Sequence, residues 1–324
     1  ETIIFYYGDH GSGMPRSKRW PYNSGLQVPL VVYIPPKYRK LAPTDYQPQG
    51  KTDRLVGFVD FAPTVLSLAG IKPPQHMQGD AFMGQYDTKP QEYLFGFRGR
   101  MDERYDLVRS VRNQRYLYIK NYMPHKKYGQ YLNYMFQTPT TQVWKKMYDA
   151  GELKPPQTYF WETKPAEELY DLQADRDEVN NLADSAEHQA VLKELKQAQH
   201  KKILAIRDLG FLPEAEFHSL ADGEAPYLVG QNKELYPLRQ ILKMADLASS
   251  GKPSGVDQLI KGLSSQNAAI RYWAAMGLLM RGEPAVAQAH ESLLNALEDN
   301  SKSVRCISAE ALGKYGAQQD VDNA

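Results

Sequence analysis

A polar loop near the start of the chain carries residue types that can bind a metal ion. Asp9 and His10 follow directly after an apolar run, residues 2–7, and Gly8 and Gly11 flank the pair. A carboxylate oxygen and an imidazole nitrogen both bind divalent metal ions. The glycines permit a sharp turn, in which two adjacent side chains can converge on one ion. The pattern predicts that Asp9 and His10 are metal ligands, and a solvated turn without a metal is the alternative.

Three cationic side chains follow Asp9 closely. Arg16, Lys18 and Arg19 lie in a stretch rich in Gly, Pro and Ser, which is not expected to form a helix. A tetrahedral oxyanion such as sulfate or phosphate requires a metal ion to polarise its oxygens and an ammonium group to neutralise the charge that grows in the transition state. The loop therefore favours chemistry on such an anion, and a solvated basic loop is the alternative.

The elements around this loop indicate how it is held. Residues 2–7 are β-branched or aromatic and stop at a glycine, which predicts a buried strand in a parallel sheet. Residues 28–35 form a second apolar run, and residues 60–70 combine helix-start residues, an apolar face and a glycine stop. This order predicts an α/β layer. Because a parallel strand needs neighbours, we expect the chain to be a fragment of a longer protein, with an edge strand that begins a small domain as the alternative.

The middle of the chain has a different pattern. Its closely spaced apolar runs predict antiparallel strands. The ranges predicted as strands are 92–97, 105–111, 116–120 and 168–172. Residues 186–208 predict a helix with one apolar side. Residues 136–165 are rich in Tyr, Pro, Thr and Lys and are interpreted as irregular.

The last part of the chain repeats itself. Residues 259–282 align with residues 293–316 at an offset of 34, with apolar residues, an arginine and a final glycine in matching positions. A helix, a turn, a second helix and a glycine stop form a hairpin that buries its apolar face only by stacking on neighbours. These hairpins resemble HEAT-type repeats, and Trp273 within them is predicted to be core. Residues 236–250 predict the helix that covers the stack.

Composition excludes several classes of partner. The 39 basic and 38 acidic residues leave a net charge of +1, which gives no argument for a nucleic acid or an anionic membrane. No apolar run approaches the roughly 18 residues of a membrane span. The one cysteine, Cys306, cannot form an internal disulfide, and its place in a helical repeat predicts a core thiol.

The order of several motifs resembles the sulfatase family, within the alkaline-phosphatase-like superfamily. The matching positions are Asp9-His10-Gly11, Lys18, Tyr22, Gly25 and Val28-Pro29, followed by residues 59–64, 68–71, 78–84, 168–172 and 178–182. The resemblance extends over residues 1–215, roughly two thirds of the chain. It implies part of an alkaline-phosphatase-like α/β sandwich in residues 1–90 and a small antiparallel-sheet subdomain in residues 91–215. The α-helical repeat region, residues 236–324, follows.

The resemblance also implies an activity. Members of the family hydrolyse sulfate esters or sulfamates with a formylglycine, made from a Cys or Ser in a C/S-x-P-x-R motif, beside a calcium ion. Asp9 and His10 match metal ligands of the family, and Lys18 matches the lysine that binds the sulfate. No C/S-x-P-x-R motif is present in this sequence. We therefore expect the formylglycine in a missing N-terminal part and predict that this chain alone is inactive.

Three further residues are candidates for substrate binding. In the sulfatase arrangement the sheet subdomain borders the pocket, so Arg100, Asp102 and His125 are candidates for binding a sulfated carbohydrate, and a salt-bridged surface turn is the alternative. The family implies a periplasmic or secreted enzyme, and the repeats could bind a protein partner. Two other functions stay open: a phosphodiester or phosphonate hydrolase of the same superfamily, and a non-enzymatic protein-binding module built on the repeats.

Overall fold

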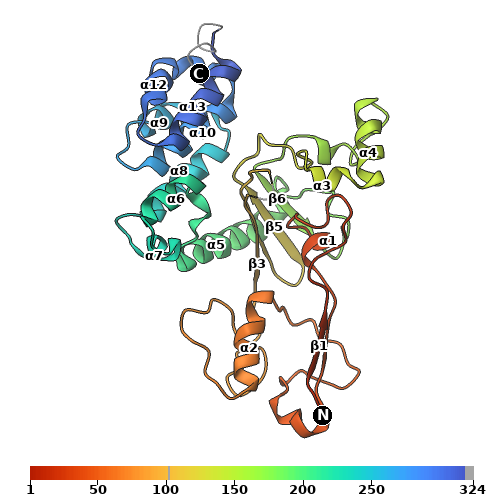
Figure 1. Cartoon of the computed structure of the whole chain (residues 1–324). Helices are drawn as coiled ribbons and strands as arrows, with labels where there is room; N and C mark the ends of the chain where they lie inside the picture. Colours follow the sequence, from red (N-terminus) through yellow and green to blue (C-terminus); the bar gives the residue numbers. More distant parts are fainter. Residues whose placement is uncertain (101–102, 318–324) are drawn as a thin grey trace.

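The computed structural model describes residues 1–100 and 103–317. One candidate site residue, Asp102, lies outside the described residues. The chain runs from a two-stranded ribbon through a four-stranded sheet into a stack of helices (Figure 1). The protein is thus a mixed α/β chain with a helical C-terminal region. The division at residues 1–90, 91–215 and 236–324 and the alkaline-phosphatase-like sandwich stay predictions.

The strands and helices have the following bounds. The strands are β1 (Ile4–Tyr7), β2 (Leu30–Tyr33), β3 (Leu94–Arg98), β4 (Val108–Arg112), β5 (Tyr116–Asn121) and β6 (Glu167–Asp171). The first helices are α1 (Asn23–Leu26), α2 (Phe61–Leu68), α3 (Asn133–Phe136), α4 (Pro139–Asp149), α5 (Gln189–Ile206), α6 (Glu214–Ala221) and α7 (Pro226–Gln231). The helices of the stack are α8 (Leu238–Ser249), α9 (Val256–Gly262), α10 (Ala268–Arg281), α11 (Glu283–Gln288), α12 (His290–Asn295) and α13 (Lys302–Tyr315).

The first apolar run forms an antiparallel ribbon. β1 pairs with β2, with Phe5 opposite Val32, and this pair is the whole of its sheet among the described residues. Phe5 and Val32 pack on a core that includes Ile34, whereas Tyr6 is 69% exposed and Val31 58% exposed. The prediction of a buried parallel strand is therefore wrong for this structure. The composition of the run predicted a strand correctly. An antiparallel neighbour can be reached through the intervening loop alone, without a crossover helix, so the strand pairs with the next strand in the chain.

Helix α2 is tied to the segment that follows it through one carboxylate. Asp60 is 1% exposed, and its oxygens accept hydrogen bonds from the backbone N–H groups of Gly57 at 2.7 Å and Asp80 at 2.8 Å. Gly79 has no space for a side chain, because a Cβ there would lie 2.0 Å from the carbonyl oxygen of Val59. Two of the motifs that carry the family resemblance thus form one structural unit.

The four-stranded sheet is the layer that supports the loop. Its order is β3-β4-β5-β6 and every pairing is antiparallel, which confirms the predicted strand type. Side chains alternate between its two faces. Val111 and Leu169 pack against α5, while Val108 and Leu117 pack against a cluster that includes Trp20 of the polar loop. The sheet therefore lies between a helix and the loop.

Helix α4 lies where an irregular segment was expected. Pro139 is its first residue, a position where the missing N–H of proline is not needed. Trp144 of this helix stacks on Phe160, with ring centroids 5.0 Å apart and planes 13° from parallel. The Thr-Pro pair before the helix was a usable start signal, but the many aromatic and polar residues obscured the periodicity.

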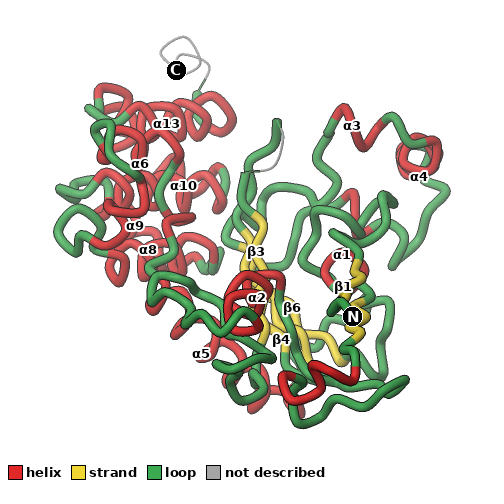
Figure 2. Tube along the Cα trace, turned by 60° about the horizontal axis from the view of Figure 1, so that its bottom comes forward, coloured by secondary structure: helices red, strands yellow, loops and turns green. Residues whose placement is uncertain are grey.

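The repeat region has the predicted helical hairpins. Asn267 and Ser301, which are 34 residues apart in the sequence, each accept a backbone N–H with the side chain at the start of α10 and α13. Trp273 is fully buried, as predicted, and its indole N–H donates to the carbonyl oxygen of Phe211 at 2.9 Å. Tyr122, directly after β5, lies in the same core. In Figure 2 the helices of the stack lie beside the sheet. The helices and the sheet therefore share one hydrophobic core.

We expect Trp273→Ala to lower the free energy of unfolding by about 3–5 kcal/mol, because it removes the largest side chain of this shared core and leaves a cavity. Urea denaturation of the whole chain measures the change. Tyr227→Ala is the matched control, since Tyr227 is 50% exposed and its truncation leaves no cavity. A loss below about 1 kcal/mol in the Trp273 variant would mean that the core collapses around the missing ring.

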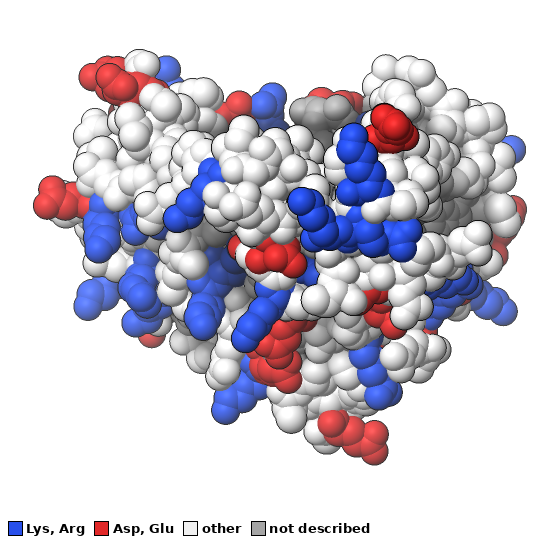
Figure 3. Space-filling model, turned by 90° about the horizontal axis from the view of Figure 1, so that it is seen from below, with Lys and Arg blue, Asp and Glu red and all other residues white. Residues whose placement is uncertain are grey.

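Two surface features complete the fold. Cys306 is exposed on α13, so the prediction of a core thiol is wrong. The face of the molecule shown in Figure 3 carries Lys, Arg, Asp and Glu side chains together, in agreement with the balanced charge of the sequence. No helix within the described residues is both long and apolar enough to cross a membrane.

Candidate functional site

The polar loop between β1 and β2 is folded tightly on itself. The N–H of Gly8 donates to the carbonyl oxygen of Pro29 at 3.3 Å, and the N–H of Gly11 donates to Gly25 at 3.0 Å. Both Gly11 and Gly25 lie against backbone: an added Cβ would lie 1.9 Å from the carbonyl oxygen of Ser24 in one case and 2.2 Å from a carbonyl oxygen in the other. These positions admit only glycine, so the loop has one compact shape.

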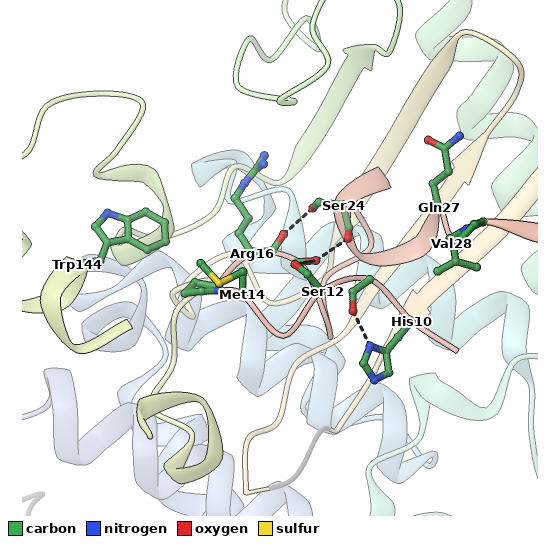
Figure 4. Close-up of a pocket in the computed structure, with 12 residues that line it drawn as sticks. His10, Ser12, Met14, Arg16, Ser24, Gln27, Val28 and Trp144 are labelled. Carbon is green, nitrogen blue, oxygen red and sulfur yellow. Dashed lines mark hydrogen bonds between the residues drawn. The ribbon is translucent and has the colours of Figure 1, made fainter. Parts of the chain in front are cut away.

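An open hollow of about 530 Å³ lies beside the loop. It is lined mainly by residues of the loop, and Trp144 of α4 closes it from the other side (Figure 4). His10 lies on its rim, with Ser12 and Met14 between His10 and Trp144 in this view. The hollow therefore borders one of the two predicted metal ligands.

Asp9 and His10 are placed so that both could contact one ion. Nε2 of His10 lies 3.4 Å from a carboxylate oxygen of Asp9, and the Asp9 side chain is 84% exposed. Nδ1 of His10 lies 2.5 Å from the carbonyl oxygen of Gly11, which holds the ring in place. Calcium binds six to eight oxygen ligands. No group of three or more His, Cys, Asp or Glu side chains suitable for a metal occurs among the described residues, so this pair alone does not make a calcium site.

Lys18 does not line the hollow and lies near an aromatic ring. Its ammonium group lies 5.5 Å from the centroid of Tyr134, and the guanidinium group of Arg19 lies 4.9 Å from the same ring. Tyr134 is 56% exposed, whereas Lys18 itself is half-buried. Lys18 and the Asp9-His10 pair thus lie in the same loop, and of these three residues His10 alone lines the hollow.

A buried ion cluster of the sheet subdomain holds the loop next to Lys18. Asp106 accepts hydrogen bonds from Lys164 at 2.6 Å and from Arg98 at 3.3 Å, and all three side chains are at most 2% exposed. The Arg98 guanidinium group also donates to the carbonyl oxygen of Arg19 at 2.8 Å. Burial lowers the pKa of Lys164, and the negative charge of Asp106 opposes this effect. No local pattern in the sequence indicates this cluster, because its members are scattered along the chain.

The two described candidates for substrate binding lie elsewhere. Arg100 forms an ion pair of 2.9 Å with Glu214 of α6, and its side chain is 59% exposed. Both ring nitrogens of His125 are buried without a hydrogen-bond partner in the described part of the chain. Burial, together with the charges of Lys126 and Lys164, lowers the pKa of His125 to about 3. Neither residue lines the hollow, so their role in substrate binding stays a prediction.

Two segments of the chain match the sequence models of known families. Residues 1–71 match the sequence model of the sulfatases, and residues 256–323 match that of the HEAT repeats. The N-terminal segment therefore resembles the sulfatases and the C-terminal segment carries HEAT repeats, as the order of the motifs predicted.

Individual relatives agree with this assignment. The chain is similar to an ulvan-active sulfatase of Formosa agariphila, 42% identical over 216 residues, which are 66% of this chain and 35% of the relative. An extracellular sulfatase SULF-1 homolog of Drosophila melanogaster is 27% identical over 114 residues, 31% of this chain and 9% of the relative. The chain thus spans about a third of the length of the ulvan-active sulfatase.

A solved structure is also similar to this chain. It shows a protein in complex with its substrate, D-glucosamine-2-N,6-O-disulfate, and is 21% identical, covering 62% of this chain and 34% of the other at a TM-score of 0.38. At that TM-score the likeness supports no argument about fold or activity.

Proposed function

We propose that this chain is part of a sulfatase that hydrolyses a sulfate ester or sulfamate of a carbohydrate. The observation that carries the proposal is the loop of residues 8–29, which lies in the segment matched by the sulfatase family and holds Asp9, His10 and Lys18. In this proposal Asp9 and His10 supply two ligands of a calcium ion, and further ligands come from residues beyond the pair. Lys18 binds the sulfate group.

The nucleophile in this proposal is a formylglycine. Its modification motif is absent from these 324 residues, so the residue would be supplied by sequence outside them. When present, a formylglycine hydrate offers the hydroxyl that attacks sulfur. Without it these residues would bind sulfate but would not turn it over.

The ulvan-active relative supports a sulfated polysaccharide or oligosaccharide as the substrate. The extracellular relative supports a periplasmic or secreted enzyme. The helical repeats would leave room for a protein partner as well, although most of their apolar residues are used by the core they share with the sheet.

The test is an ester assay on the complete protein that contains this chain. Sulfate release from ulvan oligosaccharides is compared with alcohol release from a matched phosphate diester. We expect sulfate release, and we expect a chelator to reduce it by about 10²-fold or more, because a metal ion contributes several kcal/mol of transition-state stabilisation. Addition of calcium should restore the rate.

Two results would contradict the proposal. Faster turnover of the phosphate ester would favour the phosphodiester or phosphonate hydrolase alternative. Sulfate release that is unaffected by the chelator would remove the metal role of Asp9 and His10.

A further inference from the structure

The turn at Glu178, far along the chain, forms hydrogen bonds with the loop on both sides of Lys18. Both carboxylate oxygens of Glu178 accept a hydrogen bond from the backbone N–H of Asn23 at 3.1 Å, although the two residues are 155 positions apart. The guanidinium group of Arg16 donates to the carbonyl oxygens of Asp177, at 2.8 Å, and of Glu178. Lys18 lies in the segment between these two anchored residues, so the turn fixes both of its ends.

The turn itself is preformed. The carboxylate of Asp175 accepts the N–H groups of Val179 at 2.9 Å and Asn180 at 2.8 Å. Glu178 has a φ of 55°, in the left-handed region that non-glycine residues rarely adopt. A backbone held in this region by its own turn presents the Glu178 side chain in one direction, toward the loop.

Charges of both signs surround the Glu178 carboxyl group. It is 1% exposed, and burial raises its pKa to about 7. The N–H of Asn23 and the charge of Arg16 lower the pKa, whereas Asp175 and Glu168 raise it. A buried carboxylate destabilises a protein unless hydrogen bonds and opposite charges offset the cost. The groups that offset it here belong to the loop.

Arg16 and Asn23 of the loop also contact other side chains. Arg16 lies over the ring of Tyr22 at 4.0 Å, and Arg112 of β4 donates to the side-chain oxygen of Asn23 at 2.7 Å. Arg16 is therefore a structural cation held against the sheet subdomain. Its guanidinium group contacts the Glu178 turn.

We propose that Glu178 is a positioning residue, which fixes the place of Lys18 by anchoring the loop at Asn23 and, through its backbone, at Arg16. This inference rests on the proposed role of Lys18 in sulfate binding. It predicts that loss of the carboxylate loosens residues 16–23 without unfolding the sheet. Trypsin cleaves after lysine and arginine, so the cuts after Lys18 and Arg19 report directly on this loosening.

The experiment compares four proteins: the parent, Glu178→Ala, Glu178→Gln and the control Glu162→Gln, whose side chain is exposed. Cleavage after Lys18 and Arg19 is followed by mass spectrometry and divided by cleavage after Lys51, an exposed site in another loop. We expect this ratio to rise by roughly 10-fold or more in Glu178→Ala. Glu178→Gln keeps an oxygen acceptor for Asn23 and should lie between Glu178→Ala and the parent, and Glu162→Gln should match the parent.

The kinetics of the complete protein give a second readout. Glu178→Ala should raise KM for a sulfated oligosaccharide by about 10-fold, with partial rescue by glutamine at that position. Equal trypsin ratios in the parent and the alanine variant would overturn the inference, and so would a uniform rise of cleavage at all sites, which indicates global unfolding. A parent protein that hydrolyses no sulfate ester, yet shows the expected trypsin ratios, would contradict the proposed function and support the positioning role.

Discussion

Replacing Lys18 with alanine is expected to lower kcat/KM for a sulfate ester by about 10²–10³-fold, the loss typical of one preorganised group that stabilises transition-state charge. The ammonium group is the part removed, and the loop stays in place because its anchors are Arg16, Arg19 and Asn23. Steady-state kinetics of the complete protein measure the change, and the melting temperature should stay within a few degrees of the parent.

Lys37→Ala is the matched control for this substitution. The ammonium group of Lys37 lies 5.4 Å from the ring of Tyr38, much as that of Lys18 lies 5.5 Å from Tyr134. The two variants therefore lose the same charge and the same kind of ring contact. If Lys18→Ala kept a near-parental kcat/KM, Lys18 would have no role in catalysis. Equal losses of kcat/KM in both variants would indicate a general charge effect.

Asp106→Ala is expected to lower the free energy of unfolding by about 3–5 kcal/mol, since breaking a buried ion pair leaves uncompensated charge behind. Here two cations, Arg98 and Lys164, lose their shared carboxylate while at most 2% exposed. The backbone N–H of Leu107 also loses its acceptor, at 2.9 Å. Urea denaturation of the whole chain measures the change.

An exposed ion pair provides the comparison for Asp106. Asp149 pairs with Lys145 one helical turn away, and its side chain is 58% exposed. Asp149→Ala should therefore cost only about 0–1 kcal/mol. If the two aspartate variants lost similar stability, the Asp106 cluster would be hydrated in solution rather than buried.

Local patterns in the sequence predicted the local structure well. The spacing of the repeats predicted the hairpins, and it even aligns the two helix caps, Asn267 and Ser301. Closely spaced apolar runs predicted the antiparallel sheet. These features depend on residues that are near in the chain, so periodicity and turn residues are sufficient to find them.

The burial of individual side chains, which depends on the elements that pack over them, was predicted less well. Tyr272 and Cys306 occupy equivalent positions of the two hairpins, 34 residues apart. Tyr272 is 6% exposed because it packs in the shared core, whereas no described element covers Cys306. An identical repeat position therefore has opposite exposure. The ribbon of β1 and β2 is a similar case. Composition predicted that β1 is a strand, but not that its neighbour is antiparallel.

The candidate site was predicted as a list of residue types, and its supports were missed. Asp9, His10 and Lys18 were proposed together because they lie within one short loop. Tyr134 and Glu178 contact that loop from more than 100 positions away, and no local pattern connects positions so distant. The order of the family motifs included residues 178–182, but only the hydrogen bonds reveal why that motif and the loop occur together.

The anchoring of Asn23 by Glu178 also limits when the loop can take its final shape during synthesis. A ribosome that adds about 5–20 residues per second needs roughly 10–30 seconds to make the 155 residues between them. Throughout that time Arg16, Lys18 and Arg19 have been translated, but the carboxylate that anchors them does not yet exist. The nascent loop is therefore a mobile cationic segment until Glu178 has been made, and the proposed anion site takes its final shape only after more than half of the chain has been synthesised.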